Sequence, residues 1–196
     1  MIIDIVVYDG LDELDALGPL EVLRKASAGG ADVTARLVTR EPAEVVTGAN
    51  AVRFVPDATY RAGEADVLLV PGGGWAARAP VGAWAQFQQG SWLPLLAAAR
   101  ASARLMVGVC TGTMLLAHAG VIGDRRAGTH HSAWDDLAAT GATVVRDRVV
   151  DDGDLITGGG VTSGIDVALW LVERELSPTL ADRIAAGMEY ARFRPA

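Results

Sequence analysis

The stretch from Leu105 to Ala117, LMVGVCTGTMLLA, constrains the fold more than any other part of this sequence. A short apolar run there ends in the single cysteine, Cys110, and a second apolar run follows within a few residues. This pattern predicts a buried strand over 105–109 that breaks at Cys110 into a helix starting near Thr111. Such a turn raises its side chain above the carboxyl edge of a sheet and resembles a nucleophile elbow. We expect the helix N-terminus to favour the thiolate and so to lower the pKa of Cys110.

Composition limits the classes of protein that this chain can belong to. The 196 residues, 51% of them apolar with 23 glycines, fit one domain over 1–196. A net charge of -7 and the lack of a Lys/Arg cluster argue against a nucleic-acid partner. One cysteine excludes an internal disulfide, and three histidines make a zinc site improbable, so we expect no metal and no cofactor.

The amino terminus, MIIDIVVY, carries no basic region before its apolar run, so we interpret it as a first strand and not as a signal peptide. No apolar run approaches the roughly 18 residues of a membrane span, so we expect no membrane partner. A cytoplasmic location is therefore predicted.

Strands alternate with helices along the chain. Apolar, β-branched runs predict strands over 2–8, 33–39, 66–70, 105–109, 126–129, 143–145, 149–150 and 155–157, with a hairpin over 44–55. Helical spacing predicts helices from about 18 onwards and over 80–89, 91–102, 113–119, 132–139, 164–175 and 178–190, with Ser91 as an N-cap. This alternation indicates a three-layer α/β sandwich with a mostly parallel sheet.

Four chemistry-bearing stretches follow predicted strands and should meet at the carboxyl edge of the sheet. They are the acidic loop Asp12-Glu13-Asp15, with Glu21 further on, the glycine loop Gly72–Gly74, the pair Cys110-Thr111, and the pair Thr129-His130. A thiol, an acid, backbone donors and an imidazole are the parts of a nucleophilic site.

Each part also has an ordinary structural explanation. Cys110 could be a small core residue, and Asp15 could cap a helix. His130 and His131 could be partly exposed without a role, and adjacent histidines do not face the same way, so at most one should reach the site. The glycine triplets at 72–74 and 158–160 could be turns that need positive φ angles.

Together, the residues resemble a known family. The segments PGGG after DVLLV, GVCTGTMLLAHAGV, RAGTHH, DLITGGGVTSGIDVALWLV and GMEYA are similar to the ThiJ/PfpI superfamily, relatives of class I glutamine amidotransferases. The opening segment from Tyr8 to Leu23 resembles the branch that contains isocyanide (isonitrile) hydratase and the amino-terminal domain of certain AraC-type regulators. The resemblance runs from the first strand to Tyr190 and implies a flavodoxin-like sandwich with a nucleophile elbow.

The resemblance also implies roles for individual residues. Cys110 would be the nucleophile, and Asp15 would be the acid beside it that transfers protons. Thr111 stands where protease-like relatives have a histidine, and this difference disfavours a peptidase. Gly73 and Gly74, with the Thr111 amide, would stabilise an anion. His130 and Glu21 would contact the substrate.

Two residues depart from the hydratase pattern. Leu17 stands where relatives have threonine, and His131 replaces a tryptophan. Both changes are expected to alter the pocket wall and therefore the choice of substrate.

The resemblance implies a lyase that adds water to an isocyanide and forms an N-substituted formamide. Three alternatives stay open: a glyoxalase or deglycase acting on α-oxoaldehydes, a ligand-sensing regulatory domain, and an oxidation sensor at Cys110. A homodimer is also expected, with some of the tryptophans at 75, 84, 92, 134 and 170 between subunits, although these may instead pack helices onto the sheet.

Overall fold

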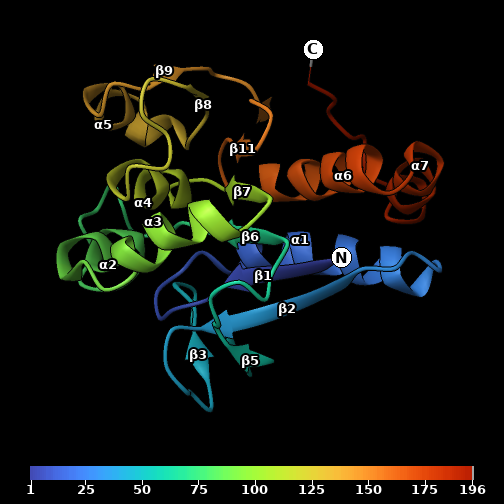
Figure 1. Cartoon of the computed structure of the whole chain (residues 1–196), viewed down its shortest axis with the longest axis horizontal. Helices are drawn as coiled ribbons and strands as arrows, with labels where there is room; N and C mark the ends of the chain where they lie inside the picture. The colour runs from blue at the N-terminus through green and yellow to red at the C-terminus, as the bar shows by residue number, and fades with distance from the viewer. Residues whose placement is uncertain (196) are drawn as a thin grey trace.

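A seven-stranded sheet forms the middle layer of the protein in the computed structural model, which describes residues 1–195 (Figure 1). Its strand order is β10-β11-β7-β6-β1-β2-β5. The strands are β1 (Ile2–Val6), β2 (Thr34–Thr39), β5 (Ala58–Thr59), β6 (Val67–Val70), β7 (Leu105–Gly108), β10 (Val149–Asp151) and β11 (Leu155–Gly158). All neighbouring pairs are parallel except β10 with β11.

The central strands form because their side chains are apolar on both faces. Every residue of β6 and β7 is buried, as expected for parallel strands covered by helices on two sides. In the register of this pair Val70 lies beside Gly108, so both strands end at one level. The loop after β6 and the turn after β7 therefore meet directly above the sheet.

Helices cover the two faces in separate groups. They are α1 (Glu13–Ala28), α2 (Ala83–Gln89), α3 (Leu93–Ser102), α4 (Gly112–His118), α5 (Trp134–Ala139), α6 (Ser163–Glu175) and α7 (Pro178–Gly187), with the short 3-10 helix η1 (His131–Ala133) before α5. Helices α1, α6 and α7 pack together, while α2 to α5 lie on the other side of the sheet (Figure 1). The predicted mostly parallel three-layer α/β sandwich is confirmed.

The start of the first helix was wrongly predicted. We expected a helix from about Gly18, because Gly18-Pro19 interrupts the apolar spacing, whereas α1 begins at Glu13 and includes Pro19 in its interior. The chain accepts this proline where α1 packs closely on α6: a Cβ added at Gly164 would lie 3.2 Å from the Pro19 ring. As a consequence Asp15 lies in the first turn of a helix and not in a loop.

Other differences are smaller. Ser91 was expected to cap α3, but the cap position is Trp92, and the Ser91 hydroxyl hydrogen-bonds to Gln86. The hairpin is present as two short strands, β3 (Val46–Thr47) and β4 (Arg53–Phe54). The predicted strands over 126–129 and 143–145 are β8 (Arg126–Ala127) and β9 (Thr143–Val144), which pair with each other outside the main sheet. The edge strand β5 was not predicted, because its two residues carry no periodic signal.

Within residues 1–195, no helix is long and apolar enough to cross a membrane. The same residues contain no group of three His, Cys, Asp or Glu side chains placed to hold a metal ion. The buried apolar side chains form a cluster that reaches from β1 to α7. The assignment of 1–196 as one domain stays a prediction.

Gly112 provides a test of how tightly the turn after β7 packs on β6. A Cβ at this position would lie 2.0 Å from the carbonyl oxygen of Val70, a contact that only a backbone shift relieves. We therefore expect Gly112→Ala to lower the free energy of unfolding by about 1–3 kcal/mol in urea titrations. The control is Gly187→Ala at the end of α7, where an added Cβ meets nothing within 4 Å and stability should be unchanged or slightly higher. Equal stability of the two variants would contradict this packing.

Candidate active site

Cys110 occupies a strained turn between β7 and α4. Its φ angle is 55°, in a region that costs a residue with a side chain about 1–3 kcal/mol. Two hydrogen bonds hold the turn: the Cys110 N–H donates to the Gly159 carbonyl at 2.9 Å, and the buried Thr129 hydroxyl donates to the Cys110 carbonyl at 2.8 Å. The expected elbow is thus formed, and hydrogen bonds from the loops after β8 and β11 fix its conformation.

The glycine loop after β6 lies against the residue that follows the cysteine. A Cβ on Gly72 would come within 2.4 Å of the Thr111 nitrogen, so only glycine allows this approach. The Gly73 N–H donates to the Thr111 hydroxyl at 2.9 Å. Because that bond occupies the Gly73 N–H, this residue does not offer the free donor that we expected. Gly74 also lines the cavity, and its N–H makes no hydrogen bond with any residue between 1 and 195.

Asp15 is fully buried in the first turn of α1, beside the elbow. Its Oδ2 accepts a hydrogen bond from the Gly72 N–H at 2.8 Å, whereas Oδ1 has no hydrogen-bond partner among residues 1–195. Burial raises the pKa of Asp15 well above its ordinary value, and the negative charge of Asp12 adds to this rise. Helix capping does not explain Asp15, because the Asp12 carboxylate caps α1 by accepting from the Leu14 N–H at 3.2 Å.

The expected lowering of the thiol pKa is wrong. Burial raises the pKa of Cys110, and the nearby Asp15 carboxylate raises it further. The backbone N–H groups of Val161 and Thr111 interact with the sulfur and oppose this rise without overcoming it. The stabilisation of a thiolate by the N-terminus of α4 is therefore smaller than the cost of removing the sulfur from water.

The sulfur faces a cavity of about 230 Å³. Cys110, Thr111, Gly73, Gly74 and His130 all line it, so the structure brings together five of the residues predicted for the site. Asp15 lies beneath them, in contact with the cysteine.

His130 and Asp12 stand on the wall of this cavity. The His130 Nδ1 hydrogen-bonds to the Ser132 hydroxyl at 2.8 Å, and its ring lies so close to Gly160 that an added Cβ there would be 2.5 Å from Cδ2. Partial burial and the neighbouring His131 lower the pKa of His130, so this imidazole is neutral near pH 7. It can therefore accept or donate a hydrogen bond without bringing a charge to the cavity.

Three residues expected at the pocket do not line it. Glu21 lies on the exposed side of α1, where it pairs with Lys25 at 3.5 Å, because a separation of six residues, about 1.7 helical turns, turns it to a different face from Asp15. Leu17 borders the same outer groove of α1, so its difference from threonine does not change the cavity wall. His131 is exposed, with its ring centroid 4.1 Å from that of His130.

Several neighbours of the site were not predicted. Tyr8 is buried beside Asp15 and Cys110, and its hydroxyl donates to the Pro71 carbonyl at 2.5 Å. Val161 and Trp75 line the cavity with Ser132. The glycines at 158–160, just before Val161, indicated that the backbone there approaches another segment closely. The sequence does not show whether an apolar residue such as Trp75 lies in the wall of a pocket or in the core.

A titration of thiol reactivity tests the coupling between Cys110 and Asp15. Because the pKa of Cys110 is raised, alkylation by iodoacetamide should be slow at pH 7 and should still be rising with pH above the ordinary thiol value of about 8.5. Asp15→Asn removes a negative charge that raises this pKa, so the midpoint of the titration should move to lower pH. Glu21→Gln, which removes an exposed carboxylate from the same helix, is the matched control and should not move it. An unchanged midpoint in Asp15→Asn would contradict the coupling.

Known proteins resemble the chain along most of its length. The model of the DJ-1/PfpI family matches residues 1–174. The isonitrile hydratase of Pseudomonas putida is 36% identical over 194 residues, which cover 98% of this chain and 80% of that protein. The Parkinson disease protein 7 homolog of Danio rerio is 28% identical over 188 residues, 93% of each chain.

Solved structures agree with this result. A ThiJ/PfpI family protein from Pseudomonas syringae superposes with a TM-score of 0.82 and 30% identity, over all of this chain and 77% of that one. Drosophila melanogaster DJ-1beta, at 22% identity and a TM-score of 0.79 over 97% of this chain and 98% of its own, shares the fold. The elbow, the sheet and these relatives together show that the chain belongs to the DJ-1/PfpI family.

Proposed function

We propose that this protein is a cysteine-dependent hydratase that adds water to an isocyanide and forms an N-substituted formamide. The observation that carries the proposal is the buried carboxyl of Asp15 beside the thiol of Cys110 at the strained elbow. The 36% identity to an isonitrile hydratase supports this reaction over others that the family's fold can host. Thr111 in place of a histidine next to the thiol disfavours a peptidase, because the usual base is missing.

The first step uses the Cys110–Asp15 pair as a proton relay. Both groups have raised pKa values, so the buried pair resists carrying two negative charges. The pair starts as a neutral thiol beside the Asp15 carboxylate, and the thiol proton passes from sulfur to that carboxylate as substrate binds. The sulfur lone pair then forms a C–S bond with the terminal carbon of the isocyanide, and Asp15 delivers its proton to that carbon. The product is a thioimidate, R–N=CH–S–Cys110, and Asp15 is again a carboxylate.

Water completes the reaction. Asp15 accepts a proton from the attacking water, whose oxygen bonds to the thioimidate carbon, and Asp15 then passes that proton to the nitrogen. Breaking the C–S bond then releases R–NH–CHO and returns a proton to the sulfur. Thr111 and Gly74 line the cavity, and we assign their N–H groups to stabilising the negative charge that develops on the tetrahedral intermediate.

The cavity suits a small, uncharged substrate. Its volume of about 230 Å³ admits a compact isocyanide, and the neutral His130 offers a hydrogen bond to substrate or water. We assign His130, with Gly73 and Gly74 in the cavity wall, to substrate binding.

Removal of either member of the pair tests the proposal. Cys110→Ala should abolish formamide production, and Asp15→Asn should lower kcat by about 100- to 10,000-fold, the range typical for loss of an acid–base group. The measurement is formamide formation from an aryl isocyanide, with circular dichroism to show that both variants fold. Asp135→Asn, an exposed carboxylate on α5, is the control and should retain full activity. An active Cys110→Ala enzyme would exclude the mechanism.

A parallel assay separates the alternative reactions. If the wild type consumes methylglyoxal and leaves isocyanides unchanged, the protein is a glyoxalase or deglycase that uses the same cysteine. If it turns over neither, the proposal of a ligand-sensing domain replaces that of a hydratase. The oxidation-sensor alternative is disfavoured because the raised pKa of Cys110 leaves little thiolate to oxidise.

We also propose that the protein is a homodimer in the cytoplasm. Apolar side chains at Leu14, Val45, Val52, Val55 and Val81 are more than a third exposed, and such surface supports a contact between copies. The tryptophans do not carry this argument, because Trp75 and Trp92 are buried within the subunit and the other three are half-buried. Sedimentation equilibrium should give twice the mass of one chain, and a monomer at micromolar concentration would contradict the dimer.

A further inference from the structure

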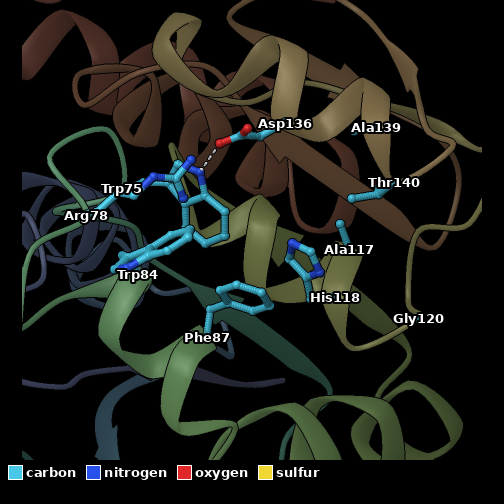
Figure 2. A pocket seen from close by; sticks show the side chains of 10 residues that line it. All are labelled: Trp75, Arg78, Trp84, Phe87, Ala117, His118, Gly120, Asp136, Ala139 and Thr140. Carbon is cyan, nitrogen blue, oxygen red and sulfur yellow. Dashed lines mark hydrogen bonds between the residues drawn. The ribbon is translucent and has the colours of Figure 1, made fainter.

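A second cavity, larger than the one at Cys110, lies between α2, α4 and α5. Its volume is about 570 Å³, within the range of small-molecule sites. Four rings surround it, those of Trp75, Trp84, Phe87 and His118 (Figure 2). Phe87 and His118 lie with centroids 4.1 Å apart, and Trp75 lies 5.1 Å from Trp84 and 5.9 Å from His118. The four rings therefore pack on one another and border an open cavity, which we call the aromatic enclosure.

One wall of this enclosure carries a carboxylate. Asp136 Oδ2 accepts a hydrogen bond from Trp75 Nε1 at 2.6 Å, and Figure 2 shows the group above the open space that the rings border. The other carboxylate oxygen has no hydrogen-bond partner, and Asp136 forms no ion pair, among residues 1–195. Partial burial lowers the pKa of His118, so the neighbouring imidazole is neutral near pH 7 and does not balance this charge. Asp136 and Arg78 are the two charged residues on the wall of this cavity, and they form no ion pair with each other.

The same aromatic group already binds one cation of the chain. The Arg78 guanidinium carbon lies 4.0 Å from the centroid of the Trp84 ring, a cation–π contact. In Figure 2 the Arg78 side chain lies beside Trp75 and Trp84, on the same side of the ring group as Asp136 and away from Phe87 and His118. Within residues 1–195 no Arg or Lys forms a cation–π contact with Phe87 or Trp75, whose faces could pack against a cationic ligand.

We propose that this enclosure is a second ligand site, for a small arylalkylammonium ion. The aromatic ring of the ligand packs against Phe87, His118 and Trp75, and its ammonium group pairs with Asp136. This site is separate from the reaction at Cys110, although the Trp75 indole lines both cavities. The inference does not depend on the proposed hydratase activity.

Three ligands that share one ring and differ in charge test the proposal by calorimetry on the full chain. They are 2-phenylethylammonium, neutral 2-phenylethanol and the anion 3-phenylpropionate. We expect the ammonium ion to bind at least tenfold more tightly than the alcohol and the anion to bind most weakly. Equal binding of the three, tighter binding of the anion, or no heat from the ammonium ion at millimolar concentration would overturn the assignment.

Variants locate the site. Asp136→Asn keeps an oxygen that accepts from the Trp75 N–H and removes the charge, so ammonium binding should fall about tenfold, to the level of the alcohol. Asp135→Asn, the adjacent exposed carboxylate, should bind as the wild type does. Cys110→Ala should also bind normally, which separates this result from the outcome of the hydratase test. Undiminished ammonium binding by a folded Asp136→Asn variant would overturn the proposal.

Discussion

The rest of the structure depends on one strained residue, Cys110, whose positive φ angle turns the chain from β7 into α4. Two hydrogen bonds, to Gly159 and from Thr129, offset the cost of this conformation. Neighbouring segments approach so closely that side chains are excluded at Gly72 and Gly112. A turn made in this way presents the sulfur at a fixed place above the sheet, which is the first requirement of a nucleophile.

Burial then decides the protonation of the pair at this turn. The thiol of Cys110 and the carboxyl of Asp15 both lie out of water, so the site discourages two negative charges and the pair keeps at least one proton. A group that holds a proton near neutral pH and sits beside a soft nucleophile can deliver that proton to a carbon under attack. This is the chemical need of isocyanide hydration, and it differs from that of a cysteine peptidase, which depends on a stable thiolate beside a histidine.

The sequence alone was sufficient to predict the sheet layers and the elbow, because buried parallel strands such as 67–70 and 105–108 are continuous apolar runs. The start of α1 was misplaced because a proline such as Pro19 usually marks a helix boundary. Only the close packing of α1 on α6 explains why the helix contains this proline. The expected substrate contact of Glu21 is also wrong, because six residues after Asp15 the helix turns this side chain to the outer surface. The thiol pKa was predicted with the wrong sign, since the depth of burial is a property of the whole fold.

The second cavity could not be predicted from the sequence either. Trp75, Phe87 and Asp136 come from three separate segments, and nothing in their spacing predicts that they border one space. Trp75 lines both this cavity and the cavity at Cys110. It directly follows the glycine loop, so the loop that shapes the site at Cys110 also positions one wall of the neighbouring enclosure.

The most direct test of the account is the mass of the Cys110 peptide during turnover of an aryl isocyanide, after rapid acid quench and digestion. The account predicts an adduct equal in mass to the isocyanide on Cys110, which appears before free formamide and decays as formamide accumulates. Formamide that accumulates while the Cys110 peptide stays unmodified at every quench time would contradict the account.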